Sequence, residues 1–236
     1  MKKLSIAAVI LLAILPSCRF IKVSDAGLKN LRESNHTDLS ASETRSLLDT
    51  TVGEFNSLYC NISCDIIYMP GDCSVAISAP DNVMGYLSIE NEEGLLSFKF
   101  KENIRVTGKN HIDITVYSPE LTGAKIDGAA DFNAPNGIKA SDFEVIVNGA
   151  GDVDINGLNT GKASVTVNGA GDIELSGVDC KEVILNIKGA GDAKISGRAD
   201  KCSATISGAG DIDASKLVCP DFRSMRRGVG SIKKPR

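Results

Sequence analysis

The sequence is poor in aromatic residues and contains no tryptophan. Aromatic residues make up 5% of its 236 positions, there are two histidines, and the formal net charge at pH 7 is −4. A chain without a basic excess lacks the charge footprint of a nucleic-acid-binding protein. The sequence also has no G-x-S-x-G nucleophile motif, no H-E-x-x-H zinc motif and no glycine-rich phosphate loop. These absences predict a non-enzymatic protein with no cofactor, no catalytic residue and no nucleic-acid partner.

No apolar run is long enough to span a bilayer. The apolar stretch Leu4–Leu15 follows Lys2 and Lys3 and precedes "LPSC", which ends at Cys18. This order is that of a secretory signal, and it resembles the bacterial lipoprotein signal, whose cysteine is lipidated. We therefore expect a signal peptide over residues 1–17 and an acylated, palmitate-bearing Cys18 that makes the lipid membrane a partner. The alternative is an ordinary secretory peptide in which Cys18 has no role.

The residue after Cys18 bears on localisation. It is Arg19 rather than an acidic residue. By resemblance to the usual bacterial sorting pattern, this favours the outer membrane within the cell envelope. Whether the protein faces the periplasm or the exterior stays open.

Two regions precede the repetitive part of the chain. Residues 18–50 are polar with few large apolar side chains, and we expect a tether there with a short helical turn near Ser42–Leu48. Residues 51–120 alternate between apolar and polar positions in short segments, which predicts an N-terminal β region. One hairpin is expected around Asn91–Gly94.

The rest of the chain, residues 121–236, repeats itself. "VNGAGDVDING" at 147–157 is followed by "VNGAGDIELSG" at 167–177, "IKGAGDAKISG" at 187–197 and "ISGAGDIDASK" at 206–216. Weaker copies stand at 126–136 and 226–236, so that equivalent glycines lie 19 to 21 residues apart. A fixed period of this length is typical of stacked repeat architectures.

Each repeat places apolar residues two and four positions before its first glycine, and four and six positions after it. Val147, Val167 and Ile187 belong to one of these four columns. Two strands with period-2 alternation and a third side of about eight residues would make one coil. The fold class predicted is all-β: a right-handed parallel β-helix with coils of about 20 residues, which the N-terminal strands continue or cap. The period argues against a β-propeller, whose blades need about 40 residues each. A sandwich of β-hairpins remains an alternative fold.

The last repeat differs from the others. Ser224, Arg226 and Lys234 occupy positions that are apolar in the earlier copies. This predicts a C-terminal coil that caps the stack and faces solvent.

Six cysteines follow Cys18, in two groups of three. An exported protein can form disulfides, but the pairing is not readable from the spacing. No C-x-x-C pair occurs, and His36 and His111 are distant from the cysteines in sequence, so no zinc site is predicted. The six are Cys60, Cys64, Cys73, Cys180, Cys202 and Cys219.

The segments "FNSLYCNISCDIIYMPGD", "ELTGAKIDGAADF" and the serial "GAGDIELSG" blocks resemble the head GIN domain family DUF2807, described as auto-transporter adhesins. The resemblance covers residues 53–234. It implies a β-helical fold and an exported or lipoprotein-like envelope setting. Cys64 stands where a small residue is usual, so disulfides are not carried over from the family.

One aspartate recurs at the same position of each repeat, directly after the glycine corner or its equivalent. In a stack of coils these residues would form a ladder of carboxylates about 4.8 Å apart, which repel by about 0.9 kcal/mol per pair in water. Backbone N–H groups near each corner are the first candidate for offsetting this repulsion, and a bound cation such as Ca²⁺ is the second. The ladder comprises Asp131, Asp152, Asp172, Asp192 and Asp211.

Polar residues beside the corners form a candidate ligand face. We expect a lipid-anchored envelope protein that presents this face to a glycan, an envelope component or a host-surface protein. A structural scaffold without a ligand and a β-helical polysaccharide lyase or hydrolase are the alternatives, and the oligomeric state stays open. The face comprises Asn148, Asn168, Lys188, Ser207, Asp154, Glu174, Lys194 and Asp213.

Overall fold

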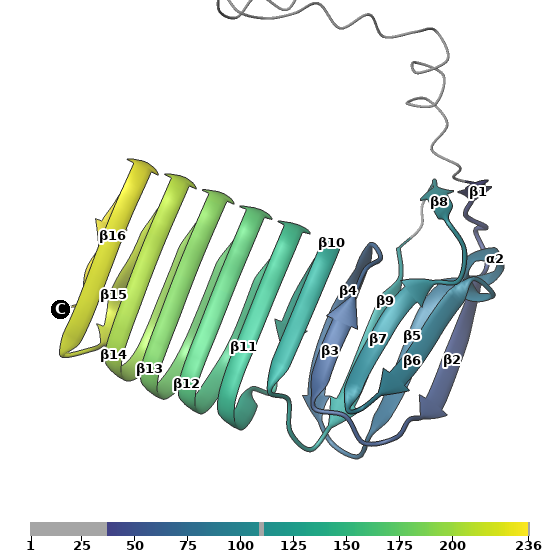
Figure 1. The fold of residues 1–236 in the computed structure, drawn as a ribbon, viewed down its shortest axis with the longest axis horizontal. Coiled ribbons are helices and arrows are strands. Elements are labelled where there is room, and N and C mark those ends of the chain that lie inside the picture. The colour runs from purple at the N-terminus through teal and green to yellow at the C-terminus, as the bar shows by residue number, and fades with distance from the viewer. Residues whose placement is uncertain (1–36, 109–110, 236) are drawn as a thin grey trace, which may run out of the picture. The chain divides into compact units, whose positions relative to one another are not determined.

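The computed structural model describes residues 37–108 and 111–235, which belong to one compact unit. The expected signal peptide, Cys18 and the first part of the expected tether lie outside the described residues. Almost all of the described elements are strands (Figure 1). In chain order they are β1 (Thr37–Ser40), β2 (Arg45–Thr51), β3 (Ser57–Cys60), β4 (Cys64–Pro70), β5 (Ser74–Pro80), α2 (Asp81–Met84), β6 (Leu87–Glu92), β7 (Leu95–Phe100), β8 (Ile104–Thr107), β9 (Asp113–Ser118), β10 (Gly123–Ala134), β11 (Ile138–Ala150), β12 (Val153–Ala170), β13 (Ile173–Ala190), β14 (Ala193–Ala209), β15 (Ile212–Val218), β16 (Asp221–Val229) and β17 (Ile232–Lys233).

The repeats stack as a parallel β-solenoid, as the sequence predicts. Val147 pairs with Val167, and Val167 pairs with Ile187, each in parallel register. The same register continues through the glycines of successive corners. The parallel pairing of β10 through β14 excludes the sandwich of hairpins, which would pair successive strands antiparallel. Figure 1 shows these strands as successive rungs.

The interior of the solenoid holds the four predicted apolar columns. Members such as Val165, Val167, Ile173 and Leu175 are 0–2% exposed. The third side also faces inward, because Leu158 pairs with Val178 and both are buried. The sequence analysis left this side without a strand, whereas the structure continues β12 and β13 through it. The coil therefore buries apolar residues from all three sides.

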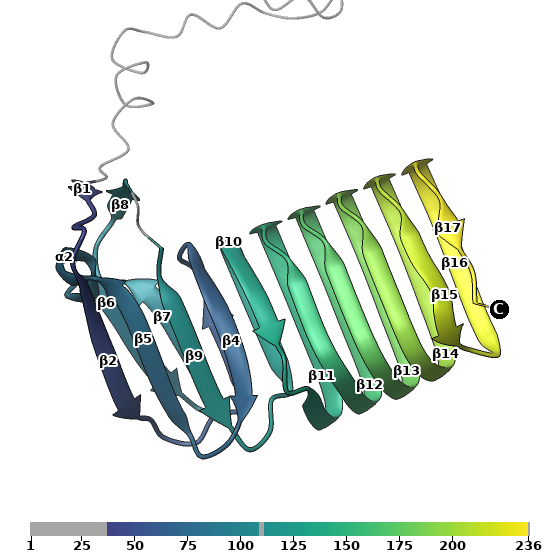
Figure 2. The ribbon, with the colours of Figure 1, turned by 180° about the vertical axis from the view of Figure 1, so that it is seen from behind.

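The N-terminal strands continue the solenoid along two branches of the same sheet. β3 and β4 both pair in parallel with β10. Beyond β4, the sheet extends through β9, β5 and β2, as seen from behind in Figure 2. Beyond β3 it extends through β7 and β6, and β6 and β7 form the hairpin expected around Asn91–Gly94. The N-terminal region thus adds rungs to the same core.

The expected tether is too long at its C-terminal end. β1 pairs with β8, and β2 pairs antiparallel with β5, so residues 37–40 and 45–51 belong to the folded region. Within the segment Ser42–Leu48, expected to make a helical turn, residues 45–48 instead belong to the edge strand β2 and residues 42–44 precede it without helix. Its side chains explain the error: Leu47 is 85% exposed and Leu48 is 37% exposed. β2 pairs with β5 through its backbone and has no buried apolar face. Its sequence therefore shows no clear alternation of apolar and polar residues.

The C-terminal coil has the polar character expected of a cap. β16 pairs with β14, which places Ser224 beside Ala204 and Arg226 beside Ile206. Apart from Asp221 and Phe222, its residues are exposed. The final rung therefore presents mainly polar and charged side chains at the end of the apolar stack, although Met225 and Val229 are exposed as well.

All six cysteines in the described part of the chain are unpaired thiols. Cys60 and Cys64 are both buried, with their sulfurs 3.2 Å apart. Cys180 contacts the Thr160 hydroxyl at 3.3 Å. Burial raises the pKa of the Cys202 thiol to about 12. Several of these cysteines therefore act as small core residues.

Candidate functional site: an acidic groove along the glycine corners

The corner aspartates align on one edge of the solenoid, where two sides of the coil meet. Asp131 lies in β10, whereas Asp152, Asp172 and Asp192 directly precede β12, β13 and β14. Asp211 precedes β15 in the same way. Asp152, Asp172, Asp192 and Asp211 are exposed, and Asp131 is half-buried. The ladder thus forms a continuous row of carboxylates facing solvent.

Backbone hydrogen bonds link the rungs of this ladder. The N–H of Asp152 donates to Asp131 Oδ1, and the N–H of Asp172 donates to Asp152 Oδ1, each at 2.8 Å. The pattern repeats at Asp192, Asp211 and finally Ser231. The sequence analysis expected donors close to each aspartate, whereas the structure places each donor in the following coil. Every carboxylate of the ladder therefore accepts a hydrogen bond that helps fix the coil after it.

Four aspartates of the ladder, all but Asp211, also line a groove of about 330 Å³. On its other side lie Asp154, Glu174 and Lys194, which pair in register along β12, β13 and β14 and are exposed. Six carboxylates thus face one lysine, and their field favours cations and hydrogen-bond donors. We call this surface the acidic groove; it comprises Asp131, Asp152, Asp172, Asp192, Asp154, Glu174 and Lys194.

The remaining residues of the expected ligand face lie outside the acidic groove. Asn168 Nδ2 donates to Asn148 Oδ1 at 2.8 Å, and Asn148 Nδ2 donates to Asp127 Oδ1 at 2.7 Å. These amides form an internal ladder of their own. Lys188 is exposed, and Ser207 is half-buried.

Asp213 also lies apart from the groove. Its carboxylate accepts hydrogen bonds from Ser215 and pairs with Lys233 at 3.1 Å. The Ser215 hydroxyl and N–H, followed by Lys233, hold the pKa of Asp213 well below its usual range. The expected face therefore divides into a groove and residues that are bonded to their neighbours.

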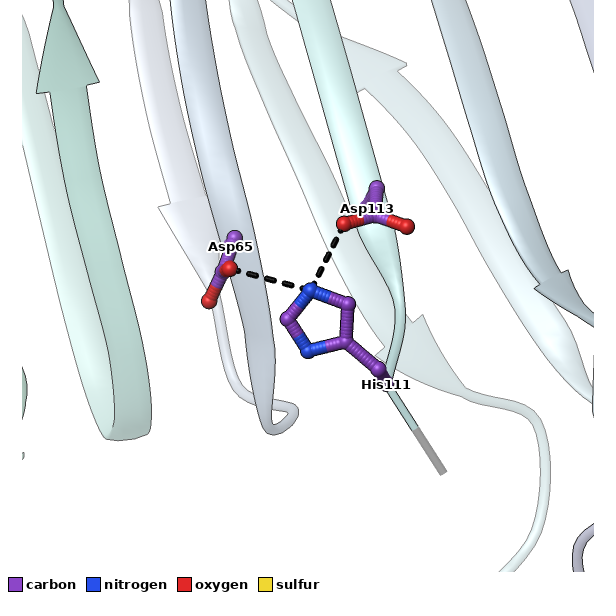
Figure 3. Close-up of side chains that lie close together, drawn as sticks. All are labelled: Asp65, His111 and Asp113. Atoms are coloured by element: carbon purple, nitrogen blue, oxygen red, sulfur yellow. Dashed lines mark ion pairs between the residues drawn. The ribbon is translucent and has the colours of Figure 1, made fainter. Parts of the chain in front are cut away.

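A second cluster was not found from the sequence. His111 Nε2 lies 3.1 Å from Asp65 Oδ2 and 2.7 Å from Asp113 Oδ1 (Figure 3). The His111 side chain is 60% exposed. The two carboxylates come from β4 and from β9, which pair in register at these positions. Only knowledge of this long-range pairing would have brought the three residues together.

Arg45 holds one side of this cluster. Its Nη2 lies 2.7 Å from Asp113 Oδ2, and its Nη1 donates to the backbone carbonyl of His111 at 2.8 Å. Asp131 lies beside Asp65 in the register of β10 and β4. Burial raises the pKa of Asp65, the His111 charge opposes that rise, and the Asp131 and Asp113 carboxylates add to it. Three carboxylates therefore converge where the N-terminal region joins the solenoid.

The cluster opens onto a hollow that adjoins the acidic groove. The hollow has a volume of about 860 Å³, and Asp65 and His111 lie at its wall. Asp131 and Asp152 line both the hollow and the groove. Small residues of the corners, such as Ala150 and Gly171, form the rest of this wall. The two concave surfaces are thus continuous along the corner edge.

Two substitutions at Asp172 distinguish the role of its hydrogen bond from the role of its negative charge. Asp172→Ala removes the acceptor for the Asp192 N–H and should cost about 0.5–1.5 kcal/mol of unfolding free energy. Asp172→Asn keeps an oxygen acceptor and removes a repulsive charge, so its stability should equal or exceed that of the wild type. Urea unfolding in EDTA measures both. Equal destabilisation by Asn and Ala would show that the charge itself is needed.

The family model for the DUF2807 "Putative auto-transporter adhesin, head GIN domain" matches residues 54–178 and 158–233. The chain belongs to this family. The resemblance recognised in the repeats is therefore confirmed. No curated protein matches the chain.

Solved structures share the fold. A putative adhesin from Bacteroides fragilis is 22% identical, with a TM-score of 0.70, and the match covers 83% of this chain and 99% of that one. A putative adhesin from Parabacteroides distasonis is 18% identical, with a TM-score of 0.73 and coverage of 84% and 100%. A protein of the same organism titled putative lipid binding protein is 15% identical, with a TM-score of 0.61 and coverage of 84% and 97%. Family and neighbours are named for adhesion or binding, not for an enzymatic activity.

The family points to a cell-envelope or surface protein. In the part of the chain that the structure describes, no helix combines the length and the apolar character needed to cross a membrane.

Proposed function

We propose that this DUF2807 protein is an adhesin-like lipoprotein of the cell envelope, and that its acidic groove binds a glycan of the envelope or of a host surface. The observation that carries the proposal is the in-register alignment of Asp154, Glu174 and Lys194 beside the aspartate ladder. The ladder offers one carboxylate per coil, and beside it Asp154 and Glu174 add a second acceptor on two coils while Lys194 adds a donor on the next. The proposal covers binding and presentation, not catalysis.

The chemistry of the groove suits a hydroxyl-rich chain molecule. Carboxylates accept hydrogen bonds from hydroxyl groups, and charge-assisted bonds of this kind are stronger than neutral ones. Consecutive rungs offer such acceptors at a spacing of about 4.8 Å. A polymer lying along the edge would make several weak contacts at once, and these add through effective concentration. The repeated groove supports this role better than any single residue would.

The proposed anchor is an acylated Cys18. It rests on the N-terminal sequence, in which Lys2, Lys3 and an apolar stretch precede "LPSC". Arg19 directly after the cysteine favours the outer membrane in this proposal. Two or more acyl groups hold a protein stably on a membrane. The rest of the polypeptide would then extend away from the membrane surface.

A scaffold without a dedicated ligand is the second candidate function. Hydrogen bonds within the molecule favour it, because the corner aspartates and the pair Asn148 and Asn168 already bond to neighbouring rungs. A groove that serves only to stabilise the stack would need no ligand.

A glycan array probed with the purified protein separates the two functions. We expect reproducible binding that falls at least tenfold in the double variant Asp154→Asn/Glu174→Gln, because two charge-assisted hydrogen bonds are weakened. The matched control is Asp142→Asn/Glu144→Gln, which removes two exposed carboxylates of β11 that do not line the groove. This control should bind like the wild type. Intact cells carrying Cys18→Ser should lose retention on the same glycan surface because the protein is no longer anchored.

Two results would contradict the proposal. If the array gives no reproducible hit, the scaffold function stands instead. If the groove variant and the β11 control bind equally well, the ligand uses another surface.

A further inference from the structure

His111 Nε2 lies between two carboxylate oxygens but has too few protons to make a hydrogen bond to each of them. Nε2 carries at most one proton, yet it faces Asp65 Oδ2 at 3.1 Å and Asp113 Oδ1 at 2.7 Å. A single N–H donates well to one acceptor, so the second carboxylate oxygen receives no full hydrogen bond from this nitrogen. A cation placed among the three atoms would satisfy all of them together.

The local charge balance favours such a cation. Asp65, Asp113 and Asp131 lie on adjacent strands in register, and Arg45 is the basic side chain that pairs with one of them. A metal-ligating imidazole is neutral, so in the metal-bound site the three carboxylates and Arg45 would leave a net charge of −2. A divalent ion would balance this charge. Arg45 binds Asp113 Oδ2, so Asp113 Oδ1 is the oxygen turned toward His111.

We propose that Asp65, His111 and Asp113 form a binding site for a divalent first-row transition ion such as Zn²⁺. The ligand atoms are His111 Nε2, Asp65 Oδ2 and Asp113 Oδ1, which all lie within 4.8 Å of one another. Figure 3 shows the three side chains pointing toward one another. Asp65 and His111 also line the hollow beside the acidic groove. Three protein ligands leave a fourth position open for water or for an oxygen of a bound molecule.

The geometry needs only small adjustments. Bonds of about 2.0–2.1 Å in a tetrahedral site separate two ligand atoms by about 3.3 Å. The Nε2–Oδ2 distance of 3.1 Å would open slightly and the Nε2–Oδ1 distance of 2.7 Å somewhat more. These movements are a few tenths of an ångström, and the three side chains are only partly buried.

The ligand types select the class of metal. An imidazole nitrogen suits Zn²⁺ and neighbouring transition ions, whereas Ca²⁺ is bound by six to eight oxygens. The site is therefore distinct from the calcium ladder considered for the corner aspartates. It also does not depend on glycan binding in the groove.

Isothermal titration of the purified protein with ZnCl₂, and separately with CaCl₂, tests the proposal. We expect one equivalent of Zn²⁺ to bind, and Ca²⁺ to bind at least tenfold more weakly. His111→Gln and Asp65→Asn should each weaken Zn²⁺ binding at least tenfold. The controls are His36→Gln, which removes the other histidine of the sequence, and Asp172→Asn, which removes a ladder carboxylate outside the cluster; both should bind like the wild type.

Two further measurements keep the test decisive. Thermal melts in EDTA should give all four variants melting temperatures close to that of the wild type, and Zn²⁺ should raise the melting temperature except in the two ligand variants. The proposal is overturned if no Zn²⁺ binds or if the two ligand variants bind normally. It is also overturned if alkylating the cysteine thiols abolishes binding, since the ion would then be held by sulfur.

Discussion

Replacing Gly169 with alanine should destabilise the protein by more than about 4 kcal/mol, or prevent it from folding. The backbone of Gly169 has φ = +146°, a conformation that residues with a Cβ rarely adopt. A Cβ there would also lie 1.9 Å from the carbonyl oxygen of Gly149 in the previous coil. The Cβ position is fixed by the backbone of Gly169, and the oxygen belongs to the backbone of Gly149, which pairs with Gly169 in register. Neither can move without separating two rungs of the stack. Urea unfolding followed by circular dichroism measures the loss.

The control for this variant is Gly85→Ala. Gly85 has φ = −64°, and a Cβ there would meet nothing within 4 Å. This variant should be unchanged or more stable by about 0.4–1 kcal/mol, because alanine restricts the unfolded chain. If Gly169→Ala folded with near wild-type stability, the close stacking of the corners would be wrong. The same argument applies to Gly149, Gly189, Gly208 and Gly228, which share this φ and this clash.

The solenoid was largely readable from the sequence because its information is periodic. Each coil repeats the same apolar positions, so Val147, Val167 and Ile187 reveal one column without any knowledge of distant pairing. The third side of the coil was less clear. Leu158 and Val178 face inward there, but Gly197 takes the equivalent place in the next coil, and the register shifts near it. A bulge of this kind interrupts the sequence period from which the strands of each coil are predicted.

The N-terminal strands were harder to predict from the sequence because they pair with strands that are distant in the chain. β2 lies on β5 across some thirty residues and exposes most of its side chains, so its sequence resembles a polar linker. The His111 cluster has the same cause. Asp65, His111 and Asp113 come from two strands and the segment before the second, and no spacing rule connects them. The aspartate ladder was found because it repeats, whereas the cluster occurs once.

Replacing Phe132 with alanine should cost about 3–5 kcal/mol and separate the unfolding of the two parts of the stack. Phe132 is fully buried, and it pairs with Ile66 of β4 on one side and with Val153 of β12 on the other. Its ring also stacks on Phe143, with centroids 6.4 Å apart. The side chain therefore fills the core where the N-terminal rungs meet the repeats. A cavity there weakens the one interface that couples both parts, since each rung contacts only its neighbours.

The chain supplies its own probe for this uncoupling. All four tyrosines, Tyr59, Tyr68, Tyr86 and Tyr117, lie in the N-terminal region and there is no tryptophan, so tyrosine fluorescence follows that region alone. Circular dichroism follows every strand. In the wild type the two signals should change at the same urea concentration, whereas in Phe132→Ala they should separate. Phe222→Ala, which truncates a half-buried ring in the last coil, should cost far less and leave the two signals together. Coincident transitions in Phe132→Ala would mean that the backbone pairing of β10 with β3 and β4 is sufficient to couple the two regions.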